Sequence, residues 1–332
     1  MKNKRNKTIL SFVVVLLLLV AMFFLAINLG SLKIGFGQML RGLFVEYDKD
    51  VATVYDLRFP RVIIAMFAGA ALAVSGVLFQ AVMKNPLADP GIIGICSGAE
   101  FVATLITALL PQYLFFTPIA AFIGGCGAFF LVYTLSWKDG LNPLRMILVG
   151  VAVNAVFSGL SSAMGTSMFG GNISSAATTL SGMISMKTWA DVKILVGYVV
   201  AGLLLSLLTI RACNLMALKD ATAGALGVNV HRNRLLVSTV AVLLASISTA
   251  VVGTIGFLAL IVPHMGRYFV GSDHKRLIPF SMVFGALVLL IADTLGRTIA
   301  MPYEISPGII MSVLGGPFFI FLLKRGGRTY GD

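Results

Sequence analysis

Charged residues are scarce in this chain, and acidic residues are scarcer than basic ones. Only 11% of the 332 residues are charged, 13 acidic and 25 basic, whereas 58% are hydrophobic and the mean hydropathy is +0.97. Soluble proteins carry about 25% charged residues, so this composition indicates a polytopic membrane protein. The sequence also lacks a Gly-x-x-x-x-Gly-Lys-[Ser/Thr] loop, a nucleophile–base set and metal-ligand spacing among its three histidines. We therefore expect no enzyme activity, cofactor or metal on this chain.

The basic residues are scattered between apolar runs, so the net charge of +12 does not indicate nucleic-acid binding and fits membrane topology better. The first apolar run follows a basic N-terminus. It is longer than the core of a signal peptide, about 7–15 residues, and no convincing cleavage site follows, so we interpret 8–29 as a retained first span. The other predicted spans, all helical, cover approximately 61–82, 92–110, 116–136, 144–167, 190–210, 234–254, 256–270, 278–296 and 308–323.

Segment 256–270 is the doubtful span, because it is short and contains Pro263. If it crosses the membrane, 16 basic residues lie inside and 8 outside, with Arg267 within the span; if it does not, the numbers are 12 and 13. The positive-inside rule therefore favours ten spans with both termini cytoplasmic. We expect one all-α transmembrane domain over 1–332. Spans two to five and seven to ten are offset by five, so a structural repeat between them would have inverted topology.

The stretch Leu57–Ala99 organises the predicted bundle. Its apolar helix, about 61–82, carries small residues at helical spacing, among them Ala65, Gly69 and Ala73. Such faces allow helices to approach closely in lipid, so this segment is predicted to be the central helix. Asn85-Pro86 and Asp89-Pro90-Gly91 are turn signals that end it.

Four stretches resemble the FecCD-type permeases, the membrane subunits of ABC importers for cobalamin, ferric siderophores and haem: Leu57–Ala99, Lys219–Val230, Gly256–His264 and Ala292–Gly316. The resemblance implies a type II importer permease in the bacterial cytoplasmic membrane, working as a homodimer. It also implies two ATPase subunits that hold ATP and Mg, and an extracytoplasmic substrate-binding protein. The expected cargo is an iron(III) complex, siderophore or haem, with cobalamin as the alternative. A proton-coupled secondary transporter is the alternative from another class.

The resemblance assigns binding-protein docking to Arg58, Arg61 and Arg297, which lie on the predicted outer side. Charged rims of this kind steer docking and set its register. The alternative interpretation is that these arginines extend to lipid headgroups.

The cytoplasmic segment 211–234 resembles the coupling helices that contact the ATPase. Asp220 can cap a short helix here, and Gly227 suits its C-terminal end. The residues assigned to this contact are Leu218, Asp220, Ala221, Ala225, Leu226 and Gly227.

A polar stripe in the fifth span consists of Asn154, Ser158, Ser161 and Ser162 at helical spacing. It either lines a translocation path or hydrogen-bonds to neighbouring helices. In the family, this span and the tenth flank the path, which adds Ser312 and Gly315.

Two acids, Glu100 and Asp293, fall within predicted spans. Intramembrane carboxylates can serve a proton relay. We favour structural roles, with Asp293 paired to Arg297 one helical turn away.

Overall fold

The computed structural model describes residues 2–29, 35–136, 143–165, 184–185, 187–301 and 303–326, and its regular elements are helices. In chain order they are α1 (Lys2–Asn28), α2 (Phe36–Phe44), α3 (Lys49–Leu57), α4 (Phe59–Met83), α5 (Ile95–Leu109), the 3₁₀ helix η1 (Pro111–Phe116), α6 (Thr117–Ser136), α7 (Pro143–Gly165), α9 (Trp189–Leu208), α10 (Ile210–Met216), α11 (Asp220–Ala225), α12 (Val230–Val252), α13 (Leu258–Val270), α14 (His274–Ile299) and α15 (Pro307–Gly326).

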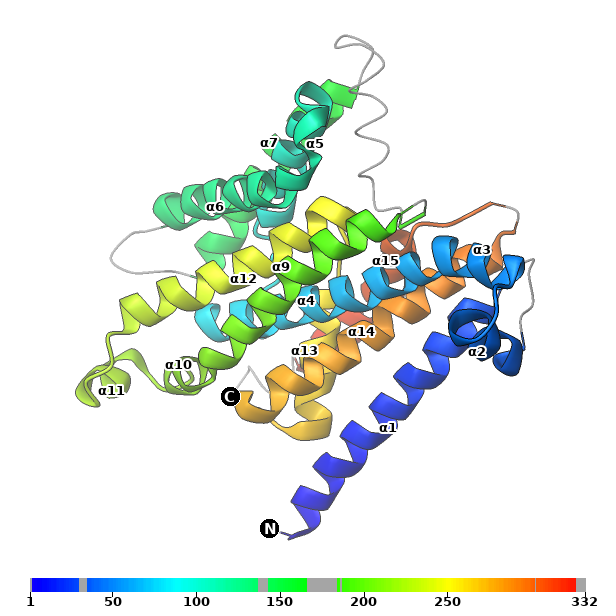
Figure 1. The fold of residues 1–332 in the computed structure, drawn as a ribbon. Helices are drawn as coiled ribbons and strands as arrows, with labels where there is room; N and C mark the ends of the chain where they lie inside the picture. Colours follow the sequence, from blue (N-terminus) through cyan, green and yellow to red (C-terminus); the bar gives the residue numbers. More distant parts are fainter. Residues whose placement is uncertain are drawn as a thin grey trace.

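Helix α4 lies at the centre of the bundle, where the sequence places the central helix. It packs against α14, α12, α9 and α13, and α1 and α3 also touch it (Figure 1). The candidate span that contains it is the most buried, with 83% of its most apolar window inside the protein. Helices α5, α6 and α7 form a second group that meets the bundle mainly through α12.

Glycines on α4 allow its neighbours to come close. A Cβ on Gly69 would lie 2.4 Å from the carbonyl oxygen of Gly285 in α14, and one on Gly76 would lie 1.9 Å from that of Ala259 in α13. Lipid provides no hydrophobic force between helices, so their association depends on the dispersion contacts that such close approach provides. The small-residue face read from the sequence therefore packs against two different helices.

Within the described part of the chain, seven helical segments are long and apolar enough to cross a membrane, which makes this a multi-pass membrane protein. Three further apolar helices, α5, α13 and α15, coincide with the remaining predicted spans but are shorter. A bilayer core takes about 20 helical residues. The prediction of ten spans is therefore not confirmed, although helices occupy all ten predicted positions among the described residues.

Irregular backbone at the ends of α4 and α12 creates room inside the bundle. Helix α4 ends at Met83, the next residue, Lys84, is left-handed (φ 49°), and turns lead to α5. Helix α12 ends at Val252, and residues 253–257 run as non-helical chain from Gly253 (φ 73°) to Phe257 (φ 64°), just before α13 begins. Non-helical backbone at membrane depth is tolerated where it lines a cavity or is enclosed by protein. These two breaks border the central cavity described below.

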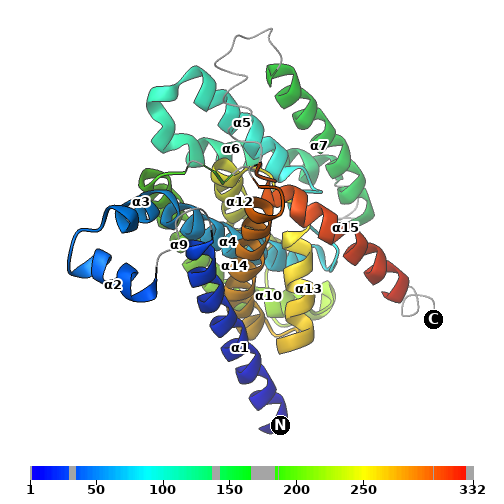
Figure 2. The ribbon, with the colours of Figure 1, turned by 90° about the vertical axis from the view of Figure 1, so that its right-hand side faces the viewer.

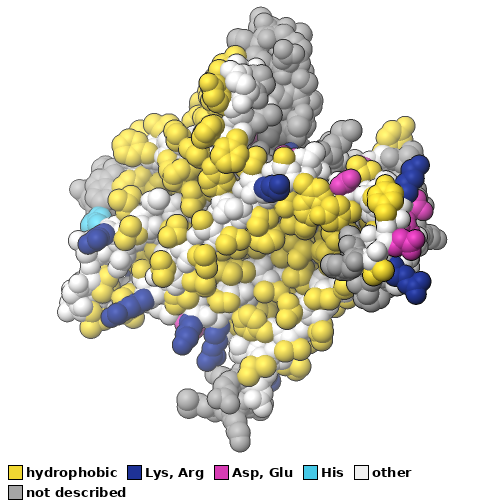
Figure 3. All heavy atoms as spheres, in the orientation of Figure 1, with side chains coloured by type: hydrophobic (Ala, Val, Ile, Leu, Met, Phe, Trp, Pro, Cys, Tyr) yellow, Lys and Arg dark blue, Asp and Glu magenta, His cyan; other side chains and the backbone are white. Residues whose placement is uncertain are grey.

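The two ends of α4 carry different structures. Helices α2 and α3 lie at its start, and α10 and α11 lie near its end (Figure 1). Hydrophobic side chains cover most of the face between them, and charged side chains gather mainly near its margins (Figure 3). This distribution suits a protein whose middle faces lipid and whose ends face water.

Candidate functional site

Arg61, in the first turn of α4, is held between two carboxylates. Its Nε donates to Asp293 Oδ1 and Oδ2 at 3.1 and 3.0 Å, and its Nη2 donates to Asp293 Oδ1 at 2.9 Å. Its Nη1 donates to both carboxylate oxygens of Glu304, each at 2.9 Å. The Asp293 side chain is fully buried in α14, whereas that of Glu304, in the α14–α15 connection, is 41% exposed. Arg61 thus joins α4, α14 and the segment before α15.

The predicted pairing of Asp293 with Arg297 is wrong, because Asp293 binds Arg61 on another helix. The Arg61 guanidinium meets the Asp293 carboxylate at both of its oxygens, the two-point geometry that makes such pairs strong. Asp293 is thus paired inside the protein, and the structural role favoured from the sequence stays a prediction. Glu304 was missed, since nothing in the spacing of the sequence relates it to Arg61.

Arg58 and Arg297 bind the C-terminal end of α1. Arg58 Nη1 donates to the carbonyl of Ile27 at 2.7 Å, and Arg297 Nη2 donates to the carbonyl of Ala26. The last carbonyls of a helix lack partners within the helix and carry partial negative charge, so cations are favoured there. Both arginines are half-buried. The three arginines assigned to docking therefore lie at one end of the bundle, and each has an internal partner.

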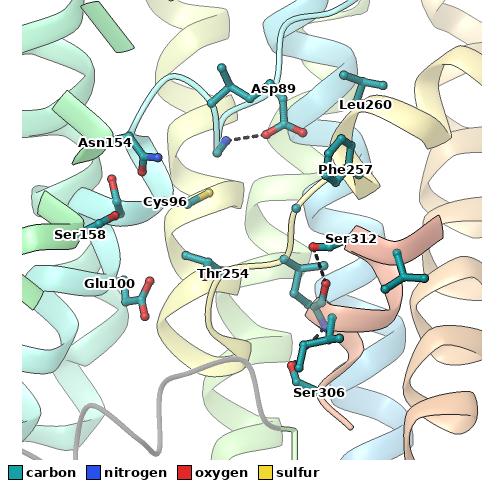
Figure 4. Close-up of a pocket in the computed structure, with 18 residues that line it drawn as sticks. Asp89, Cys96, Glu100, Asn154, Ser158, Thr254, Phe257, Leu260, Ser306 and Ser312 are labelled. Carbon is teal, nitrogen blue, oxygen red and sulfur yellow. Dashed lines mark hydrogen bonds between the residues drawn. The ribbon is translucent and has the colours of Figure 1, made fainter. Parts of the chain in front are cut away.

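A cavity of about 600 Å³ opens between the start of α5, α7, residues 254–257 and the start of α15. Figure 4 shows Asn154 and Ser158 of α7 on one side and Ser306 and Ser312 on the other. Glu100 of α5 and Asp89 of the α4–α5 connection also line it, with no Lys, Arg or His among the described lining residues. Its wall is thus rich in hydroxyl groups and carries acidic side chains.

Three of the six predicted path residues line this cavity: Asn154, Ser158 and Ser312. The other three do not. Ser161 is half-buried outside it, and Ser162 donates to the carbonyl of Ser158 one turn earlier at 2.9 Å. Gly315 packs on Phe257, since a Cβ there would lie 2.4 Å from the Phe257 side chain.

Glu100, Asp89 and Thr254 are among the lining residues that the polar stripe did not predict. All three lie more than 50 residues from the stripe in the chain, so no local spacing relates them to it. A signal for Glu100 existed, because a carboxylate within an apolar span is costly unless it faces protein or water. The structure places it at the cavity, whereas Asp293 lies at the arginine cluster.

The third site is the short helix α11 and its flanks. Asp220 is its first residue and not its N-cap, because Lys219 holds that position without a side-chain bond. The Asp220 carboxylate instead accepts from Lys84 Nζ at 2.7 Å and from Arg234 Nη2 at 2.9 Å. The hydrogen bond from Lys84 is the main reason that the pKa of Asp220 lies below its usual value, and the charge of Arg234 acts in the same direction. These bonds fasten α11 to the ends of α4 and α12.

Apolar side chains are exposed on α11 and at its two flanks, and together they form the α11 patch. Leu218 and Leu226, which flank the helix, are 39% and 64% exposed, and Ala221 and Ala225 of the helix are also exposed, whereas Ala223 packs inward. Gly227 ends the helix at φ +77°, as predicted. Ion pairs therefore hold a short helix whose flanking leucines stay at the surface.

These features define a class: an all-helical, multi-pass membrane permease with a polar cavity between its helices and a distinct site at each end. The chain belongs to the FecCD transport family, whose model matches residues 17–325. The identification from the four sequence stretches as an ABC importer permease is thereby confirmed, and the chain is a transport subunit.

The similarity to known proteins extends over nearly the whole chain. The chain is 38% identical over 325 residues to proteins named as the haem-iron transport system permease IsdF in Staphylococcus aureus strains Newman and COL, with 98% of each chain covered. A solved structure of a metal-chelate type ABC transporter in an inward-facing conformation matches with a TM-score of 0.80 and 28% identity, over 95% of this chain and 98% of that one. PsaBC from Streptococcus pneumoniae matches with a TM-score of 0.59 and 19% identity, over 86% and 95%, and shares the fold.

Proposed function

We propose that this chain forms a homodimeric permease that works with two ATPase subunits and an extracytoplasmic binding protein to import an iron(III) complex. Haem is the first candidate cargo, because the relatives named IsdF are haem-iron permeases and span nearly the entire chain. An iron–siderophore complex is the second candidate, and cobalamin is the alternative. Selection of the cargo belongs mainly to the binding protein.

The observation that carries this proposal is the apolar patch on α11. Leu218 and Leu226 remain exposed although Asp220, Lys84 and Arg234 fix the helix in place. An ATPase groove that buries these leucines could move α11, and α11 would pass that motion directly to α4 and α12 through the ion pairs. In this assignment α11 and both termini are cytoplasmic, and α2 and α3 lie outside.

A second copy of the chain would cover α7 and α15, which lie on the same side of the molecule (Figure 2). Only 17% of the most apolar window of α7 is buried, and Val156, Val313 and Leu314 are more than half exposed. Apolar side chains alone could face lipid. However, Ser158 and Ser312 line a polar cavity open between the same two helices, which favours a path at a dimer axis.

Binding-protein docking is assigned to the outer arginine cluster, Arg58, Arg61 and Arg297. Together with Asp293 and Glu304 the cluster has a net charge of +1, from three cations and two anions. Acidic side chains on the lobes of a binding protein would complement this charge and set the orientation of docking.

A proton-coupled secondary transporter is the competing function, and Glu100 at the cavity is the observation that favours it. Asp293 counts against this function. A proton relay would need Asp293 as a second acid, but Asp293 lies away from the cavity and is already neutralised by Arg61.

Co-purification with the ATPase subunit tests the proposal. Leu218→Glu and Leu226→Glu each place a charge in the α11 patch, and we expect both to abolish retention of the ATPase. Leu57→Glu is the matched control, because Leu57 is 68% exposed at the opposite end of α4 and should leave retention unchanged. Equal retention by wild type and both α11 variants would refute the assignment of α11.

A further inference from the structure

The two carboxylates on Arg61 differ in how easily they can leave. Asp293 is fully buried, so separating it from Arg61 would leave an unpaired charge inside the protein. Glu304 has a 41% exposed side chain and binds only Nη1 of the guanidinium. On leaving Arg61 it would pass into water, where a carboxylate is well solvated. Another carboxylate can therefore replace Glu304 on Arg61, whereas Asp293 stays bound to Arg61.

Glu304 also sits on a segment that leads to the cavity. Ile305 N donates to the carbonyl of Gly296 at 2.8 Å, and the next residue, Ser306, lines the cavity. Gly308, in the first turn of α15, packs near the carbonyl of Thr254, 3.1 Å from where a Cβ would stand. The bond between Glu304 and Arg61 thus ties the outer rim of the cavity to the start of α4.

We propose that Glu304 is an internal competitor for the docking partner: a carboxylate of the binding protein replaces Glu304 on Nη1 of Arg61 and so releases residues 303–306. This inference rests on the docking proposed above and adds to it a link from docking to the cavity. Arg61 keeps two carboxylates throughout, so no unpaired buried charge arises during the exchange. The incoming group needs the same two-oxygen geometry that Glu304 presents.

If this exchange occurs, one variant should show both tighter docking and a looser segment around residue 304. Glu304→Gln removes the competing charge, so the binding protein should dock about fivefold more tightly, the scale of one partly exposed ion pair. The same variant should loosen residues 303–306 without any partner present. A purely structural Glu304 would weaken docking when removed, and a Glu304 unrelated to docking would leave the affinity unchanged.

The test uses the full-length chain in lipid nanodiscs and its haem-loaded extracytoplasmic binding protein. Spin labels at Leu57→Cys and Tyr303→Cys, in a background with the three native cysteines replaced by serine, report the distance across the rim; both side chains are strongly exposed, at 68% and 80%. We expect a narrow distance distribution in the otherwise wild-type chain. The distance distribution should broaden in the labelled Glu304→Gln variant. It should broaden likewise when the binding protein is added to the labelled chain that keeps Glu304. Docking affinity is measured in parallel on unlabelled protein.

Glu46→Gln is the matched control, because it neutralises another exposed acid near α2 and α3 that does not bind Arg61. It should change neither measurement. Unchanged or weaker docking by Glu304→Gln, with wild-type docking intact, would overturn the exchange and leave the proposed function standing. Absence of docking by the wild-type chain would overturn both the exchange and the docking on which it rests.

Discussion

Replacing Asp293 with Asn is the sharpest perturbation of the folded bundle. Arg61 donates three hydrogen bonds of 2.9–3.1 Å to Asp293, whose side chain is fully buried. At an effective dielectric constant of 20, unit charges 4 Å apart attract by about 4 kcal/mol. Removing one member of a buried pair typically costs about 3–5 kcal/mol, because the other charge stays buried. Glu304 still neutralises part of the Arg61 charge, so we expect a loss near the lower limit, about 3 kcal/mol.

The assay is the free energy of unfolding from sodium dodecyl sulfate titration in mixed micelles. Glu304→Gln is the comparison within the same site and should cost about 1 kcal/mol or less, because its partner remains paired with Asp293 and Glu304 is partly exposed. The double variant Arg61→Met with Asp293→Leu removes both buried charges and should recover most of the loss. A loss below about 1 kcal/mol for Asp293→Asn, or no recovery in the double variant, would refute the reasoning.

Two further predictions concern the ends and the packing of α4. The pKa of Asp220 is lowered chiefly by its hydrogen bond from Lys84, so its stabilising contribution is complete above the usual value of 3.8 and is lost as the pH falls through the lowered pKa. Wild type and Asp220→Asn should therefore differ in stability at neutral pH and converge at acidic pH; a constant difference would contradict this. Gly76→Ala would place a Cβ 1.9 Å from the carbonyl of Ala259 and should cost about 1–3 kcal/mol of unfolding free energy. Gly127→Ala, which meets no atom within 4 Å, is the control, and equal effects would contradict the packing argument.

The central helix and the family were predictable because their signals are local. Small residues repeating along 61–82 specify a helix with close neighbours, and the turn signals after it specify where it ends. The glycine that ends α11, Gly227, was predictable for the same reason: only a residue without a Cβ enters the left-handed region without strain.

The partners of charged side chains were not predictable, because they lie on distant parts of the chain. Arg61 and Asp293 are 232 residues apart, and Lys84 and Asp220 are 136 apart. The rule for pairs one turn apart on a helix predicted Arg297 as the partner of Asp293, and the preference for Asp at helix starts predicted that Asp220 caps α11. Both predictions were wrong. The cavity shows the same limit, since the polar stripe on α7 found Asn154 but not the acids that face it.

The length of the spans was the other limit. Hydropathy located α5 and α15, and the positive-inside rule added α13, but the non-helical residues that precede α5 and α13 shorten those helices. Those non-helical residues border the cavity. The helices are therefore short at the place where a translocation path would need polar backbone groups. The inverted repeat stays a prediction.

The most direct test of the account is solute accumulation in proteoliposomes. The purified chain alone, given haem-loaded binding protein outside and a pH gradient, should accumulate no haem. Adding the ATPase subunits with ATP and Mg inside should start uptake, and Leu226→Glu should prevent it. Haem accumulation driven by the pH gradient in the absence of nucleotide and ATPase would contradict the claim that this permease is driven by its ATPase partner.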